Sequence, residues 1–183
     1  MKSATEEART AVQWWRDLQP YYLSDGSRNP RADRAALARL RRADLLGAMQ
    51  DPATFALFRA LGRQHPNDLP GVALSTGVLA SVREDRADQH PARTLGPPSM
   101  DAIEQAAMKP LRFRRLIEAD APEERLLMLR RAVQLAAHKL NVRELAAACL
   151  DWSDGRRQRW IFEYYNAGFA APANEPTSEE AAI

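Results

Sequence analysis

Apolar residues in this chain recur at the spacing of an α-helix, and this periodicity constrains the fold more than any other feature. Between residues 122 and 140 the apolar stripe is formed by Leu126, Leu129, Val133, Ala136 and Leu140. Similar stripes recur along most of the chain, whereas no stretch alternates convincingly with the two-residue period of a strand. The sequence therefore predicts an all-α fold.

Polar residues that can cap helices mark several predicted helix starts. Asp51 precedes Pro52, and proline suits the first helical position because that residue needs no N–H partner. Asn141 and Glu144 have the spacing of a capping box. From Asp33 we predict one helix that continues to residue 49. The other predicted caps are Thr5, Asn67 or Asp68, Asp120 with Glu123, and Asp154.

The chain divides by composition into two helical parts. Residues 87–99 are polar and rich in proline, which is typical of a loop or linker. We predict an N-terminal helical bundle over residues 1–86, a connecting loop over 87–99, and a C-terminal helical bundle over 100–169, packed into an elongated molecule. Residues 170–183 carry glutamates and no basic residue, so we predict a disordered acidic tail.

The sequence offers no group of residues suited to catalysis or to metal binding. No two of His65, His90 and His138 stand at the spacing of metal ligands. The single cysteine, Cys149, lies on an apolar stripe, where burial would keep its thiol unreactive. Motifs for a serine nucleophile, a phosphate loop or a zinc protease are absent. We predict a protein that is not an enzyme and that uses no metal and no cofactor.

The location of the protein follows from its hydropathy. The N-terminal residues lack the apolar core of a signal peptide, and no apolar run is long enough to span a bilayer. We therefore expect a cytoplasmic protein that makes no membrane contact.

Arginine supplies most of the positive charge. All but three of the 26 basic residues are arginines, the exceptions being Lys2, Lys109 and Lys139. Arginine makes forked contacts with phosphate and stacks on bases, so the bias favours a nucleic-acid partner. A GC-rich genome would produce the same excess without such a function.

Arginine doublets lie beside the apolar stripes of separate predicted helices. Such clusters are often solvated faces paired with Asp and Glu. If the helices form a bundle, however, several doublets could line one groove and neutralise successive phosphates. The doublets are Arg41–Arg42, Arg114–Arg115, Arg130–Arg131 and Arg156–Arg157.

The aromatic residues have a spacing that favours packing in the core over base stacking. Trp14 and Tyr22 are the aromatic residues that we expect to be exposed. Those expected in the core are Trp15, Trp152, Trp160, Tyr164 and Tyr165.

Six segments, taken in order, resemble a known family. The order and spacing of these segments are similar to those of the small subunit of Cascade, the type I-E CRISPR surveillance complex (the CasB-type family). The resemblance spans residues 14–165 and implies an all-α protein with an N-terminal and a C-terminal helical bundle and no catalytic role. The segments are ALARLRRA, GVALSTGVLASVRED, RTLG, LRFRRLIEA, LMLRRAV and the ending LDW…RRQRW…YY.

The resemblance also implies a role in antiviral defence. Two copies of the subunit would pack head to tail in Cascade, against its backbone and large subunits. They would contact the crRNA and the target and displaced DNA strands, and their basic surface would help to hold the R-loop open. The residues that the resemblance assigns to nucleic-acid binding are Arg41, Arg42, Arg112, Arg130, Arg131, Arg156, Arg157 and Arg159. The arginine pattern adds Arg114 and Arg115, together with Arg34 on the polar face of the helix that carries Arg41.

Two other interpretations remain open at the level of sequence. In the first, the chain is a helical scaffold whose arginines bind an acidic protein partner, so that no nucleic acid would co-purify with it. In the second, it is a hydrolase or a transferase. That interpretation rests on the carboxylates alone, and several of these stand at predicted helix starts, where capping accounts for them.

Overall fold

The fold is built almost entirely from helices, as predicted. The computed structural model describes residues 3–21 and 27–166, so Tyr22 and the predicted acidic tail lie outside the described residues. Helices account for 67% of the structure and strands for 3%. In chain order the elements are α1 (Ala4–Leu18), α2 (Arg34–Arg42), α3 (Leu45–Gln50), α4 (Pro52–Ala60), the 3-10 helix η1 (Pro66–Asp68), α5 (Leu69–Leu79), β1 (Glu84–Asp85), α6 (Pro91–Leu95), the 3-10 helix η2 (Met100–Gln105), α7 (Pro110–Glu118), α8 (Pro122–Leu135), β2 (Lys139–Leu140), α9 (Val142–Leu150) and α10 (Asp154–Tyr164).

Helix α5 is the centre of the core. All of its residues from Val72 to Leu79 are buried, and it packs against α3, α4, α8 and α9. Its small side chains allow this close packing: a Cβ on Gly77 would lie 2.9 Å from Leu126 Cδ1 on α8. The one hydroxyl-to-hydroxyl bond described in this core joins Thr54 of α4 to Thr76 of α5 at 2.8 Å.

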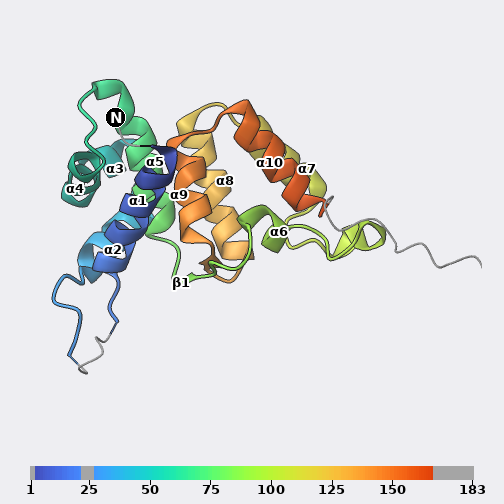
Figure 1. Cartoon of the computed structure of the whole chain (residues 1–183), viewed down its shortest axis with the longest axis horizontal. Helices are drawn as coiled ribbons and strands as arrows, with labels where there is room; N and C mark the ends of the chain where they lie inside the picture. Colours follow the sequence, from blue (N-terminus) through green and yellow to red (C-terminus); the bar gives the residue numbers. More distant parts are fainter. Residues whose placement is uncertain (1–2, 22–26, 167–183) are drawn as a thin grey trace, which may run out of the picture.

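Helices from the two ends of the sequence pack against each other. Helix α9 contacts both α1 and α5, and α8 contacts α3 and α5. Figure 1 shows α1, α5, α8 and α9 together in the middle of the molecule, with α2 and α4 at the left and α7 and α10 at the right. The predicted division into two bundles stays a prediction.

The proline-rich connection contains the short helix α6. The ring Nδ1 of His90 accepts a hydrogen bond from the backbone N–H of Ala92 at 3.2 Å, and Pro91 occupies the first helical position. Leu95 is fully buried, and α6 packs against α10. A five-residue helix is too short to give a periodic signal, so composition alone indicated a loop.

Several helix boundaries differ from the sequence-based prediction. The stripe predicted to continue to Leu140 ends with α8 at Leu135, and Leu140 lies in β2. Ser3, rather than Thr5, caps α1 in a capping box with Glu6. The predicted continuous helix after Asp33 is broken after Arg42, and Asp44 starts α3 by accepting a hydrogen bond from Gly47 N at 2.7 Å. Asp44 competes for the backbone in this way because its short side chain can bond to the N–H groups that follow it.

Other predicted caps have mixed outcomes. Asp33, Asp51 and Asn141 cap their helices with side-chain hydrogen bonds, as predicted. The predicted side-chain caps at Asp120 and Asp154 are wrong, because the residues at the cap positions are Ala121 and Ser153. The side chain of Asp120 is engaged elsewhere in an ion pair, described below.

The structure also contains one strand pair that the periodicity did not predict. Strands β1 and β2 are parallel, with Glu84 opposite Lys139 and Asp85 opposite Leu140. Two residues cannot display an alternating pattern, so the pair left no signal in the sequence. It connects the segment after α5 to the segment between α8 and α9.

Most of the aromatic residues lie in the core, as predicted, but Trp14 does not follow its prediction. Its side chain is 8% exposed, and its Nε1 donates a hydrogen bond to Ala53 O at 2.9 Å. Trp160 and Tyr164 are fully buried, and the hydroxyl of Tyr164 donates to Met108 O at 2.6 Å. A tryptophan on the edge of a helical stripe can be buried because its N–H finds an acceptor.

Candidate nucleic-acid interface

The predicted arginines have three kinds of environment in the structure. The first kind is an exposed side chain with no acidic partner at ion-pair distance among residues 3–21 and 27–166. Such a side chain keeps its full charge available to an external anion. The predicted arginines of this first kind are Arg34, Arg42, Arg112, Arg115 and Arg131.

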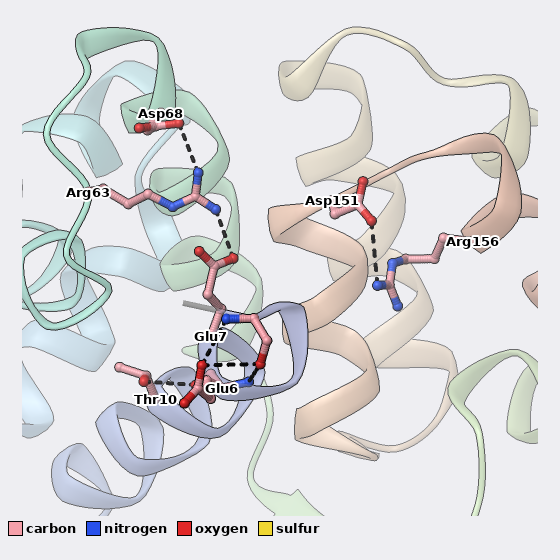
Figure 2. Close-up of polar contacts among 8 residues, drawn as sticks. Glu6, Glu7, Thr10, Arg63, Asp68, Asp151 and Arg156 are labelled. Atoms are coloured by element: carbon pink, nitrogen blue, oxygen red, sulfur yellow. Dashed lines mark hydrogen bonds and ion pairs between the residues drawn. The ribbon is translucent and has the colours of Figure 1, made fainter. Parts of the chain in front are cut away.

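The second kind of environment is an ion pair within the protein. Arg156 forms the ion pair with Asp151 that Figure 2 draws, at 3.5 Å, and Arg157 lies 2.6 Å from Asp120. The other two pairs are of the i to i+4 type: Arg114 with Glu118, both exposed, and Arg159 with the buried Glu163. Arg114 and Arg159 match the solvated, paired face that the sequence analysis set against nucleic-acid binding, whereas Arg156 and Arg157 are paired but partly buried.

Arg63 shows how such a pair stabilises the fold. Its guanidinium is 2.8 Å from Glu7 on α1 and 3.0 Å from Asp68 in η1, so it joins two segments (Figure 2). It illustrates that arginine in this chain also has a structural use.

The third kind of environment is contact with backbone carbonyls, and Arg130 shows it most fully. Its guanidinium donates to Gly77 O at 3.1 Å, to Ala43 O at 2.8 Å and to Leu40 O. The last carbonyls of a helix have no partner within that helix, so Arg130 satisfies the end of α2. Burial lowers the pKa of Arg130, and the nearby Asp44 opposes this shift.

Arg130 brings two of the predicted doublets together. Because it reaches the carbonyls on both sides of Arg42, the C-terminal end of α2 lies beside the middle of α8. Arg42 lies in the chain between two of the residues whose carbonyls bind Arg130, and Arg131 follows Arg130. Both side chains are exposed, although they are far apart in the sequence. We call these two exposed arginines, Arg42 on α2 and Arg131 on α8, the α2–α8 surface.

Arg41 also bonds to a backbone carbonyl. Its Nε donates to Ala80 O at 2.6 Å, just after the end of α5. Burial lowers the pKa of Arg41, and the positive charge of Arg83 lowers it further. Two guanidinium groups therefore lie near each other at this point.

The arginines of α7 and α10 lie away from the α2–α8 surface. Figure 1 shows α2 at the left end of the view and α7 and α10 at the right. Arg112 and Arg115 are thus a separate basic site on α7, whereas Arg157 is tied to the connection between α7 and α8 through Asp120. The structure brings together the doublets of α2 and α8 and leaves the other two apart from them.

Sequence reasoning missed three residues that lie near the predicted arginines. Arg83 lies beside Arg41, while Arg28 and Tyr21 line a hollow together with Arg34. Arg83 and Arg28 are single arginines in short irregular segments, where no periodicity marks a face. Tyr21 follows Pro20 after the end of α1. Its side chain is 41% exposed, and no pattern in the sequence indicates this exposure.

The titratable groups of the core are occupied by structural contacts. The thiol of Cys149 is buried, which raises its pKa to about 12, with nearby Arg125 opposing the shift. Burial lowers the pKa of His90, while Glu144 and Glu163 oppose this. Within the described part of the chain, no three His, Cys, Asp or Glu side chains gather where they could hold a metal ion. No described helix combines the length and the apolar character needed to cross a bilayer.

The fold and its surface define a class of protein: a small helical protein with a buried apolar core and arginines on its outside. The comparison with family models identifies the family within that class. The model of the CRISPR-associated protein Cse2 matches residues 36–165, which is more than half of the chain, so the chain belongs to the Cse2 family. No curated protein and no solved structure matches it.

Membership of this family confirms the resemblance seen in the sequence. The Cse2 family is that of the small subunit of the type I-E CRISPR complex Cascade, a structural subunit of an assembly with other proteins. The match covers α2 through α10, and therefore both the α2–α8 surface and the arginines of α7.

Proposed function

We propose that this subunit stabilises the crRNA-guided R-loop of Cascade through phosphate contacts made by its exposed arginines. One observation carries the proposal: Arg42 and Arg131 are exposed, lack acidic partners among the described residues, and are adjacent in the chain to the residues through which Arg130 of α8 bonds to the C-terminal end of α2. The partners in this proposal are the backbone and large subunits, a second copy of the subunit, the crRNA, and the target and displaced DNA strands, in the cytoplasm.

The physical demands of the role match this surface. In an RNA-guided complex, base pairing with the guide reads the sequence, so a subunit beside the R-loop needs no contacts that read bases. Contacts with phosphate fix the position of a strand and carry no sequence information. Exposed guanidinium groups on rigid helices provide such contacts, and their strength falls steeply with salt.

The proposed role is not catalytic. At neutral pH the Cys149 thiol stays protonated because burial raises its pKa to about 12. His90 uses its Nδ1 to accept the first N–H of α6, and the Nδ1 of His138 is 2.9 Å from Ser81 O. Cys149, His90 and His138 are therefore occupied by burial or by hydrogen bonds within the protein.

The test compares two charge-matched double variants in the assembled complex. Arg42→Ala with Arg131→Ala removes two charges from the α2–α8 surface. Arg16→Ala with Arg86→Ala removes the same charge from exposed arginines that have acidic partners, Asp85 and Asp88. The readout is the fraction of target DNA held as an R-loop at fixed complex concentration, with the amount of subunit in the complex measured alongside.

We expect the Arg42 and Arg131 variant to hold a smaller fraction of target DNA as an R-loop, with unchanged incorporation of the subunit into the complex. The Arg16 and Arg86 variant should resemble the wild type. Equal losses in both variants would mean that net charge alone matters and would overturn the proposal. Loss of incorporation in the first variant would instead indicate that these arginines bind an acidic protein surface. That result would favour the scaffold interpretation.

A further inference from the structure

Two adjoining hollows lie where α1 ends and α2 begins. They have volumes of about 440 Å³ and 330 Å³ and share Pro20, Tyr21 and Arg34 in their walls. Arg28 completes one of them, and Arg41 and Arg83 complete the other. Volumes of this size are in the range of small-ligand sites, about 300–1,000 Å³. We call the two hollows together the Tyr21 pocket.

The described lining of the Tyr21 pocket is basic, and residues 3–21 and 27–166 contribute no carboxylate to it. Four arginines line it, whereas many other arginines of this chain face an acidic partner. Asp17 and Asp33, on the helix end and helix cap that border the pocket in the sequence, have other partners: Asp17 is 3.2 Å from Arg31, and Asp33 accepts the N–H of Ala36. Burial and the positive charge of Arg83 lower the pKa of Arg41, so an anion brought from outside would be favoured beside these two arginines.

The wall that carries Tyr21 is held in place. The backbone N–H of Asn29 donates to Tyr21 O at 2.9 Å. The side-chain amide of Asn29 donates to Asp17 O and Gln19 O, both at 2.9 Å, and Asn29 is only 7% exposed. These bonds hold the backbone of Tyr21 and the side chain of Asn29 at the end of α1, and Tyr21 is 41% exposed.

An exposed aromatic ring among guanidinium groups that have no acidic partner within residues 3–21 and 27–166 suits a nucleotide as a ligand. A base stacks on an aromatic ring irrespective of its identity, and the guanidinium groups grip the phosphates on either side of it. We propose that the Tyr21 pocket binds one unpaired nucleotide of the displaced DNA strand, with the base on Tyr21 and the phosphate between Arg34, Arg41 and Arg83.

This inference rests on the proposed function, and it adds a contact with a base to contacts with phosphate alone. The displaced strand is the partner that fits, because its bases are unpaired in an R-loop, whereas the guide and target strands pair with each other. The pocket is distinct from the α2–α8 surface, since neither Arg42 nor Arg131 lines it.

The experiment uses the full chain and two fluorescent hexanucleotides at low salt. One is dT6, and the other is an abasic DNA hexamer with the same number of phosphates. Fluorescence anisotropy gives the affinity of each, and the ratio of the two affinities isolates the contribution of the bases. The variants are Tyr21→Ala, Tyr21→Phe, Arg83→Ala and, as a control, Phe162→Ala, another exposed aromatic residue, which lies on α10.

We expect the wild type to bind dT6 about tenfold more tightly than the abasic hexamer, the effect of stacking one base. Tyr21→Ala should reduce the ratio to about one, while Tyr21→Phe and Phe162→Ala should keep it. Arg83→Ala should weaken both hexamers equally and leave the ratio unchanged. Far-ultraviolet circular dichroism checks that each variant is folded.

Three outcomes would overturn the inference: equal affinities of the wild type for both hexamers, binding of neither hexamer, or a base preference that survives Tyr21→Ala. The proposed function is judged separately, in the assembled complex and with Arg42 and Arg131. If the wild type shows no preference for bases, nucleotide binding in the Tyr21 pocket is refuted, but the proposed function is not.

Discussion

The two arginines of the α8 doublet should respond very differently to substitution. Arg130 donates to three carbonyls at the junction of α2, α5 and α8, whereas Arg131 is exposed. We therefore expect Arg130→Ala to destabilise the fold and Arg131→Ala to leave its stability unchanged. If so, the doublet combines one structural arginine with one that is available to nucleic acid.

The size of the effect follows from the bonds that are lost. A hydrogen bond in a folded protein contributes roughly 1 kcal/mol net, and somewhat more when the donor is charged. Three such bonds give a loss of about 3–4 kcal/mol in the free energy of unfolding for Arg130→Ala. In a protein of this length each kcal/mol lowers Tm by about 2–4 °C, so Tm should fall by roughly 10 °C. For Arg131→Ala, a surface substitution, the change should stay within about 0.5 kcal/mol.

Urea denaturation of the isolated chain, followed by circular dichroism, measures both values. Arg130→Lys adds a third comparison, because lysine keeps the charge but cannot reproduce the planar fork that reaches three carbonyls. It should lose most of the stability that alanine loses. The reasoning would be refuted if Arg130→Ala and Arg131→Ala cost the same, or if Arg130→Lys were as stable as the wild type.

Three further predictions follow from other contacts. A Cβ on Gly96 would lie 2.1 Å from Tyr164 O, so Gly96→Ala should push α6 from α10 and lower Tm clearly, whereas Gly155→Ala, in open space, should not lower it. Cys149 should react with a thiol reagent at pH 8 only when urea unfolds the chain, because burial raises its pKa to about 12; fast labelling of the folded chain would contradict this. Burial places the folded pKa of His90 below its unfolded value of about 6.5. The unfolded state therefore takes up the proton first as pH falls below about 6.5, and stability decreases. His90→Asn, which keeps a capping acceptor, should flatten this part of the stability–pH curve; an unchanged curve would show that His90 does not contribute.

The sequence predicted the class of fold because helical periodicity is a local property. Residues such as Leu126, Leu129 and Val133 lie on one face of α8 whatever the rest of the chain does, and all three are buried. The same holds for the caps at Asp33 and Asp51, where the side chain bonds to an N–H two or three residues ahead. These features need no knowledge of distant partners.

The environments of the arginines could not be predicted in this way, because their partners are distant in the sequence. Arg130 bonds to carbonyls of residues 40, 43 and 77, and Arg157 pairs with Asp120. A helical wheel places both members of a doublet beside an apolar stripe and cannot show which guanidinium meets a carbonyl, a carboxylate or solvent. The site residues therefore stay predictions, and the structure sorts them into those that are free to bind and those that are engaged.

The exposure of Tyr21 could not be predicted from the sequence either. In the sequence it stands next to Pro20 and Tyr22 with no pattern to separate exposed from buried rings. Its exposure and its arginine neighbours arise because Asn29 closes the turn and because α2 brings Arg34 and Arg41 alongside. A pocket formed by segments that meet only on folding leaves no signature in a single stretch of sequence.

The salt dependence of the affinity with which the assembled complex binds target DNA as an R-loop tests the central claim most directly. Each phosphate contact with a single strand contributes about 0.7 to the slope of log affinity against log salt, and each contact with duplex about 0.9. Replacing Arg42 and Arg131 with alanine should therefore lower the slope by about 1.4–1.8, while the Arg16 and Arg86 control should keep the wild-type slope. An unchanged slope in the first variant would contradict the claim that these two arginines hold the R-loop by its phosphates.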